Sequence, residues 1–98
     1  VVTEPEAPFR VFDVSKCWED LCGYDYIESK DKTLGSLLGG PETDAASATG
    51  LIAQLLRGEE AGATLTNYTK SGRPFRNRVR VGPLKKDGKV EFFVGVLQ

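Results

Sequence analysis

The sequence predicts an α+β domain in which short helices cover one face of an antiparallel sheet. From Ala61 onward apolar and polar residues alternate, and two turn signals divide this region into three strands. Before it, Ala45–Arg57 has apolar residues at helical spacing, which is typical of a helix packed on a sheet. Ninety-eight residues fit a single domain, so we expect residues 1–98 to form one unit.

The N-terminal quarter predicts a hairpin followed by a short helix. Val1–Thr3 and Phe9–Val14 have the composition of strands, and the two prolines between them suit a turn. Ser15 is a good helix cap and Gly23 a good helix stop, which predicts a helix over Lys16–Leu21. Between residues 25 and 32 we expect a single helical turn. The buried side of this region is expected to consist of Trp18, Leu21 and Tyr24.

The central stretch Thr33–Asp44 contains three glycines and one proline, which preclude a long regular element. Within it, Gly35–Gly40 fits either a helical turn or an open loop. Asp44 then caps the predicted helix over Ala45–Arg57, and Gly58 ends it. The apolar side of that helix is expected to carry Leu51, Ile52, Leu55 and Leu56.

Three strands joined by short turns are expected to complete the domain as a meander. The turns are Lys70–Arg73 and Lys85–Gly88. The strands that they separate are 63–68, Pro74–Val81 and Val90–Leu97.

The composition excludes several classes of site. The chain has no histidine, the commonest general base and metal ligand near neutral pH, so we expect neither an enzyme nor a metal centre. Cys17 and Cys22 are too few for a metal site, and their spacing on one helix points them apart, so both are expected to be buried free thiols. No apolar run approaches the roughly 20 residues of a membrane span. These features predict an intracellular protein, cytoplasmic or nuclear, without a membrane partner.

Charge is unevenly distributed along the chain. The net charge is −1, but residues 1–49 carry 10 acidic and 4 basic side chains, and residues 50–98 carry 4 and 9. This asymmetry predicts a two-sided polar molecule. It does not by itself indicate a nucleic-acid binder, so contact with nucleic acid is expected only through other domains.

Several motifs resemble those of a LOV domain of the PAS superfamily. Gly40-Pro41-Glu42-Thr43-Asp44 is followed, after a helix, by Asn67-Tyr68-Thr69-Lys70-Ser71-Gly72-Arg73-Pro74-Phe75-Arg76-Asn77. Leu21-Cys22-Gly23-Tyr24 and Phe93-Val94-Gly95-Val96 lie at the expected places, so the resemblance covers essentially the whole chain. It implies the PAS fold, a five-stranded antiparallel sheet around a small-molecule pocket. In typical LOV domains the pocket holds FMN, and blue light drives a cysteine of the central helix to bond the flavin.

The sequence departs from the LOV pattern at the positions that hold the flavin. Counted back from Gly40, the photoactive cysteine falls on Gly35 and a phosphate-binding arginine on Ser36. A second phosphate-binding arginine, which the resemblance places within the long helix, is replaced by Ile52. Each lost charge-assisted hydrogen bond is worth roughly 1.5–3 kcal/mol, so FMN affinity should drop by orders of magnitude. The sequence therefore predicts a domain without photochemistry, in which FMN is disfavoured and no cofactor is bound. Further flavin contacts of the family fall on Leu34, Gly39 and Leu97.

Asn67 and Asn77 are the remaining candidates for polar contacts with a pocket ligand. Strand alternation places both on the inner face of the sheet, with Leu65, Val79, Val81, Phe93 and Leu97. The alternative is that the two amides bond each other, the backbone or water. Glycines 35, 39 and 40 could open a pocket, or three neighbouring leucines could fill it. The filled version is favoured, with Leu34, Leu37 and Leu38 as the filling residues.

The outer face of the sheet is a second candidate site. Arginines alternate outward on the middle strand of the meander, and apolar residues do so on the last strand. A row of charges is often only a solvated surface, but the neighbouring apolar stripe favours an interface. We expect a second copy, a flanking helix or a partner protein to cover this face, with acidic groups opposite the arginines. The residues of this predicted interface are Arg76, Arg78, Arg80, Phe92, Val94 and Val96.

These patterns lead to two hypotheses about function. The first is a non-photoactive LOV-like PAS module that acts in dimerisation or signal relay within a larger regulatory protein, such as a transcription factor or a kinase. The alternative is a sensor domain that binds a flavin or another small molecule non-covalently in the PAS pocket.

Overall fold

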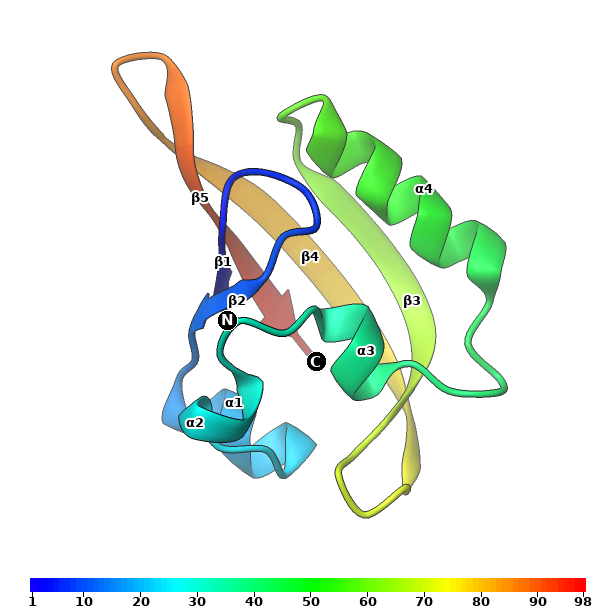
Figure 1. The fold of residues 1–98 in the computed structure, drawn as a ribbon. Helices are drawn as coiled ribbons and strands as arrows, with labels where there is room; N and C mark the ends of the chain where they lie inside the picture. The colour runs from blue at the N-terminus through cyan, green and yellow to red at the C-terminus, as the bar shows by residue number, and fades with distance from the viewer.

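A five-stranded antiparallel sheet forms the frame of the molecule, with strand order β2-β1-β5-β4-β3 (Figure 1). The structure, a computed structural model, describes all residues from 1 to 98. This sheet and the helices beside it confirm the predicted α+β class. The strands are β1 (Val2–Thr3), β2 (Val11–Asp13), β3 (Ala61–Tyr68), β4 (Pro74–Lys86) and β5 (Lys89–Leu97).

Four short helices connect the N-terminal hairpin to the meander. They are α1 (Lys16–Cys22), α2 (Tyr26–Ser29), α3 (Leu34–Leu38) and α4 (Ala45–Leu56). Each begins at a residue whose side chain accepts a backbone N–H of the first turn, which satisfies one of the free donors there. The capping residues are Ser15, Asp25, Thr33 and Asp44.

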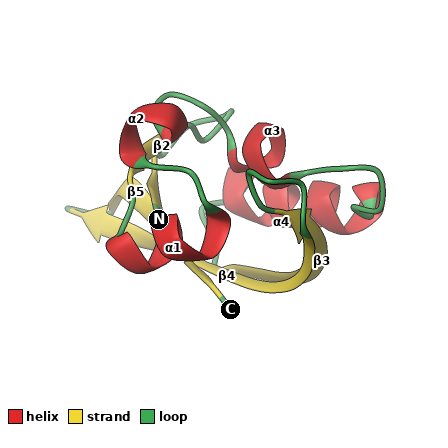
Figure 2. Cartoon of the chain, turned by 90° about the horizontal axis from the view of Figure 1, so that it is seen from below, coloured by secondary structure: helices red, strands yellow, loops and turns green.

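The helices α3 and α4 lie on the same side of β3 and β4, and no helix covers the other side of these strands (Figure 2). Of the two alternatives for Gly35–Gly40, the structure has the helical turn and not the open loop. It forms the five-residue helix α3, which ends where Gly39 returns to extended backbone. This short helix is placed over the inner face of the sheet, beside β3.

The N-terminal region differs from its prediction in two ways. Both strands of the hairpin are shorter than expected, and Phe9 lies in the connection between them. On α1, Trp18 and Cys22 are buried, whereas Leu21 is exposed. The expected burial of Leu21 is wrong because the buried side of α1 is centred between Trp18 and Cys22, and Leu21 lies farther round the helix from that centre.

The strand β4 is longer than predicted. It continues through Gly82 and Pro83 to Lys86, because its pairing with β5 persists to the turn, with a shift in register after Leu84. The hairpin turns at Asp87 and Gly88, which have positive φ angles of 52° and 78°. The long β4–β5 hairpin projects beyond the rest of the sheet (Figure 1).

Two clusters of buried apolar side chains stabilise the fold. The first lies between α4 and the sheet and includes Leu55, Leu65 and Phe93. The second joins α1, α3 and β2 and includes Trp18 and Leu37. The apolar side of α4 is narrower than predicted, since Leu51 and Leu55 pack against the sheet but Ile52 and Leu56 are exposed. None of the helices has the length and apolar character needed to cross a membrane.

Candidate ligand cavity and outer sheet face

An apolar cavity of about 160 Å³ lies between α3, α4 and the inner face of the sheet. Its lining contains no ionisable side chain. Leu37 and Leu38 are buried, yet the cavity remains, so the prediction that leucines fill the pocket is wrong. The reason is that Leu37 packs away from the cavity, in the cluster with Trp18 and Cys22.

The three glycines of the central stretch have different roles. A Cβ atom on Gly40 would collide with the ring of Tyr68, and one on Gly39 would lie 2.5 Å from the Gly35 carbonyl oxygen. Both positions therefore need glycine for close packing. Gly35 lines the cavity, and a Cβ atom there would meet nothing within 4 Å. Only Gly35 leaves room for a side chain.

Asn67 and Asn77 lie where the strand alternation predicts, in the lining of the cavity, at 5% and 0% exposure. The Asn77 Nδ2 group donates a hydrogen bond to Asn67 Oδ1 over 2.8 Å, and Asn67 Nδ2 donates to the Leu38 carbonyl over 3.2 Å. The Oδ1 atom of Asn77 is buried without a partner. Leaving such an acceptor unpaired costs about 1–3 kcal/mol, which makes it available to a ligand N–H or O–H group.

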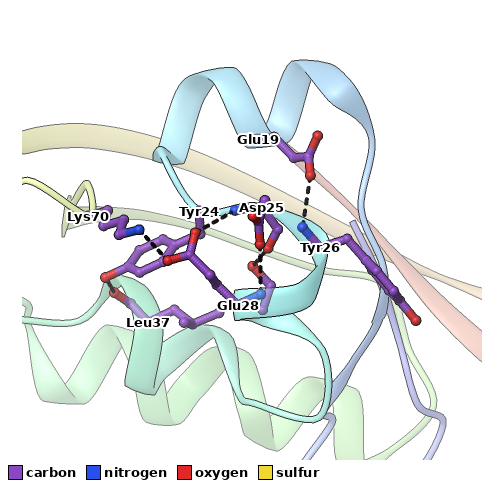
Figure 3. Close-up of polar contacts among 8 residues, drawn as sticks. Glu19, Tyr24, Asp25, Tyr26, Glu28, Leu37 and Lys70 are labelled. Carbon is purple, nitrogen blue, oxygen red and sulfur yellow. Dashed lines mark hydrogen bonds and ion pairs between the residues drawn. The ribbon is translucent and has the colours of Figure 1, made fainter.

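The helix α3 is held beside the cavity by contacts from both sides. Tyr24 donates its hydroxyl hydrogen bond to the Leu37 carbonyl over 3.1 Å (Figure 3). From β3, Asn67 donates to the next carbonyl of α3, that of Leu38. Tyr24 precedes α2, which starts with a reciprocal capping box between Asp25 and Glu28. Glu28 also pairs with Lys70 from the β3–β4 turn, and this bond lowers the pKa of the Glu28 carboxyl. Through these contacts α3, which forms part of the cavity wall, is connected to the β3–β4 turn.

Neither cysteine lines the cavity. Cys22 is fully buried in the second cluster, and this burial raises the pKa of its thiol to about 11. Cys17 is exposed on α1, so the prediction that both thiols are buried is wrong for Cys17. Both thiols are free, as predicted.

The outer face of the sheet carries the six residues that the sequence placed there. Arg76, Arg78 and Arg80 are exposed along β4. On β5, Val96 is 54% exposed and the side chains of Phe92 and Val94 are half-buried. The sequence did not single out a seventh member, Phe12 of β2, whose ring lies 4.8 Å from that of Phe92. Alternation over a three-residue strand is too short a signal to identify it.

Comparison with known proteins gives matches over the whole chain. The PAS domain family matches residues 2–98. Phototropin-1A of Oryza sativa subsp. japonica is 32% identical over 101 residues, covering 98% of this chain and 10% of the phototropin. A blue-light-activated histidine kinase of Brucella anthropi is 29% identical over 96 residues, covering 96% of this chain and 19% of the kinase. The chain therefore spans about a tenth to a fifth of the length of these relatives.

Solved structures match equally well. The light-state structure of the Aureochrome1 LOV blue-light photoreceptor superposes with a TM-score of 0.93 at 26% identity, over 100% of this chain and 77% of that chain. A LOV domain from a study of a flavin analogue superposes with a TM-score of 0.91 at 29% identity, over 99% and 73%.

These matches correct the expectation about the cofactor. The departures from the LOV motif led to the prediction that no cofactor is bound and that FMN is disfavoured. The similarity over the full chain is to a phototropin, a blue-light-activated kinase, a blue-light photoreceptor and a LOV domain from a flavin study, and it contradicts that prediction. Individual motif positions overstate the loss of the flavin site, because a ligand site is made by the whole cavity and not only by its charged contacts.

Proposed function

Because the chain belongs to the PAS domain family, we propose that it is a sensory module that binds a flavin in its cavity without bonding it covalently. The observation that carries this proposal is the apolar cavity with the unpartnered Asn77 Oδ1 in its lining. Residues 1–98 act as one module in a larger intracellular regulatory protein, such as a kinase or a transcription factor. The names of the relatives support FMN as the first flavin to test.

The chemistry of the lining suits the ring system of a flavin. The apolar side chains of the lining would bury the faces of its flat aromatic ring, and Asn77 Oδ1 would accept a hydrogen bond from an N–H group at its polar edge. Bound flavin supplies absorption of blue light. An apolar cavity of about 150 Å³ takes a single benzene ring, so this cavity has to widen to hold a flavin. The lining contains no lysine or arginine, so the cavity itself provides affinity for the ring and not for a phosphate.

The positions of the thiols support the non-covalent mode. Gly35 stands where the LOV resemblance expects the photoactive cysteine, and neither Cys17 nor Cys22 reaches the lining. Gly35 also has room for a side chain. A cysteine introduced at this position therefore tests both the location of the flavin and the absence of a thiol in the native cavity.

Absorption spectroscopy of the purified domain tests the proposal. We expect FMN or riboflavin to raise the melting temperature of the domain and to give a structured absorption band in the blue. Illumination should not bleach this band, because no thiol lies beside the flavin to form a bond with it. Gly35→Cys should make the band bleach in blue light and recover in the dark, whereas Gly35→Ala should not. A melting temperature and a spectrum that neither flavin changes would contradict flavin sensing. Bleaching of the native protein that Cys22→Ser removes would contradict the non-covalent mode.

We also propose that the outer sheet face is the surface through which the module relays its signal, by association with a second copy or a partner. The exposure of its arginines and of Val96 supports this role. Light scattering after size exclusion distinguishes the two. If the partner is a second copy, the native domain should be a dimer and Val94→Asp should make it monomeric. A monomer at high concentration that is unchanged by Val94→Asp would exclude self-association through this face.

A further inference from the structure

We propose that Ser71, in the turn between β3 and β4, is a phosphorylation site, and that its phosphate draws the Lys70 side chain away from Glu28. This exchange of partners releases α2 and loosens the hold of Tyr24 on α3, the helix beside the ligand cavity. The inference adds a regulatory modification to the proposed function. It rests on that function only for its last step, the change in flavin affinity.

The β3–β4 turn presents Ser71 to solvent at one end of the sheet (Figure 1). Lys70 precedes the serine and Arg73 follows it by two positions, and all three residues are exposed. Ser71 Oγ lies 3.0 Å from Thr69 Oγ1, a hydrogen bond within the turn. Thr69 is half-buried, and its hydroxyl also accepts the Arg73 backbone N–H over 3.2 Å. A kinase that selects basic residues beside its serine therefore finds one accessible hydroxyl in this turn, that of Ser71.

A hollow beside the turn has room for the phosphate. Phosphoserine carries a charge of about −1.5 to −2 at pH 7 and three strong acceptor oxygens. Arg73 takes part in none of the three ion pairs of the structure, so its guanidinium is free to bond the phosphate from within the turn. The hollow lies between the end of α1 and the turn, and the residues around it include Asp20, Leu21, Gly23, Thr69, Ser71 and Arg73.

Lys70 can change its partner without movement of the turn. Its backbone N–H donates to the Cys22 carbonyl over 2.9 Å, which holds its main chain against the end of α1. Its Nζ atom pairs with Glu28, and the two side chains are 52% and 34% exposed (Figure 3). Ion pairs with this exposure are weak. A phosphate of nearly two charges on the neighbouring residue therefore competes well with a single carboxylate.

Loss of Lys70 removes one of the supports of α2. This helix has four residues, so contacts from outside it decide its stability. Glu28 Oε1 accepts the Asp25 backbone N–H over 3.1 Å, and Oε2 is the atom that pairs with Lys70. A nearby phosphate would also repel this carboxylate. Tyr24 directly precedes α2 and donates to the Leu37 carbonyl of α3 over 3.1 Å, so movement of α2 loosens α3 as well.

The expected effect on flavin binding is an increase in affinity. Leu34, Gly35 and Leu38 of α3 line the cavity, which has to widen to hold a flavin. A contact that holds α3 in place opposes this widening, so its loss makes the wider state easier to populate. Phosphorylation should raise flavin affinity about two- to fivefold, the range that an exposed ion pair can supply. General damage to the fold would instead lower flavin affinity.

Phosphorylation of the purified domain in vitro tests the site. The reagents are ATP and the catalytic domain of a serine/threonine kinase that selects an arginine two residues after its serine. The γ-phosphoryl group forms a bond to Ser71 Oγ as its bond to ADP breaks, and the hydroxyl proton passes to the catalytic aspartate of the kinase. Mass spectrometry should find one phosphate, at Ser71. Ser71→Ala should abolish it, whereas Ser36→Ala, at another exposed serine, should not. Arg73→Gln should slow the reaction several-fold, and Arg57→Gln should not.

Hydrogen exchange and flavin titration test the consequence. In the phosphorylated domain the backbone N–H groups of residues 26–30 should exchange faster, and FMN should bind more tightly. Glu28→Gln should produce both changes without the phosphate, and phosphorylation should add little to them because the ion pair is already lost. Glu59→Gln is the matched control, since it breaks the exposed pair with Arg57 instead, and it should produce neither change.

Absence of phosphate at Ser71, phosphate chiefly at another residue, or unchanged exchange of residues 26–30 in the phosphorylated domain would each overturn the proposal. Weaker FMN binding after phosphorylation would overturn it as well. Failure of the proposed function gives a different result. A domain that binds no flavin, but whose residues 26–30 exchange faster after phosphorylation, keeps the modification and its effect on α2 and removes flavin sensing alone. Flavin binding without phosphorylation at Ser71 removes the modification alone.

Discussion

Asn67 and Asn77 are polar residues at positions where apolar side chains are expected. Both point to the inner face of the sheet, where their neighbours Leu65, Val79 and Val81 are buried hydrocarbons. The pair satisfies three of its polar groups internally but leaves Asn77 Oδ1 without a partner. A buried amide of this kind lowers stability unless a ligand uses it. The pair is therefore the strongest residue-level argument for a ligand with an N–H group.

Substitution of this pair should separate stability from ligand binding. Asn77→Leu leaves Asn67 Oδ1 without its donor, so we expect it to lower the free energy of unfolding by about 1–3 kcal/mol. Asn67→Leu/Asn77→Leu removes both buried amides and should cost less than the two single substitutions together. Both variants should lose flavin affinity by at least about tenfold. Urea denaturation and flavin titration measure the two quantities, and a double variant that binds flavin normally would contradict the role of the amides.

The two thiols should differ sharply in reactivity. Cys17 is exposed and should react with a disulfide reagent at pH 8 at the rate of a free thiol, whereas Cys22 should react only after unfolding. Burial raises the pKa of Cys22 from its ordinary value of 9.0 to about 11. The folded thiol thus stays protonated where the unfolded thiol ionises, and this contribution to stability is lost as the pH rises from about 9 to 11. Cys22→Ser should remove that part of the pH dependence, and Cys17→Ser should not. Rapid labelling of Cys22 in the native protein would contradict the packing of α1.

At the scale of elements, α4 illustrates how a local signal specifies a helix. Asp44 accepts the Ser47 backbone N–H over 3.2 Å and also bonds the Ser47 hydroxyl, and these bonds lower the pKa of its carboxyl. Four residues of this helix line the cavity, so its stability bears directly on the site. Those residues are Ala48, Leu51, Ile52 and Leu55.

Removing the cap should destabilise the domain in a pH-dependent way. The folded pKa of Asp44 lies below its ordinary value of 3.8, so the stabilisation is present above that pH and is lost as the pH falls through the lowered pKa. Asp44→Ala should lower the melting temperature at pH 7 by a few degrees. Asp44→Asn keeps a capping oxygen, so it should melt near the native temperature at pH 7 and lose less stability at pH 3. Equal acid sensitivity of the native and Asn variants would show that Asp44 does not contribute.

The elements that the sequence predicts are those with local signals. Caps and periodicity placed α4 and the three meander strands, and period two placed Asn67, Asn77 and Arg80 on their observed faces. The end of β4 was missed because Gly82 and Pro83 interrupt the alternation, while the pairing with β5 continues. The sequence also failed to predict that the cavity is not filled by the leucines of α3. This depends on Leu37 packing in the cluster that contains Trp18, a tertiary arrangement that no local pattern encodes.

On the scale of the whole molecule, β5 connects the cavity side of the sheet with the outer face. Phe93 points inward, and its ring lies edge-on to Phe9 at 5.6 Å between centroids. Phe92 points outward and packs on Phe12 at 4.8 Å. Phe9 and Phe12 lie close together in the sequence, Phe9 in the β1–β2 connection and Phe12 in β2. Phe9 also lines the cavity and has a positive φ of 63°, which is strained for a bulky residue. This hairpin is therefore in contact with the cavity and with the outer face at once.

Hydrogen exchange should show that this hairpin is the least stable part of the sheet and that Phe9 holds it in place. The strands β1 and β2 have two and three residues, so residues 2–13 should exchange faster than β3, β4 and β5. Phe9→Leu removes the aromatic contact with Phe93, and we expect the additional exchange to be concentrated in residues 2–13, including Phe12 at the outer face. Phe75→Leu, the same change at a half-buried position of β4, should not affect the hairpin selectively. Saturating FMN should slow exchange in the native hairpin, because Phe9 is part of the cavity lining. An increase spread evenly over all five strands in Phe9→Leu would mean that Phe9 supports only global stability and does not link the two faces.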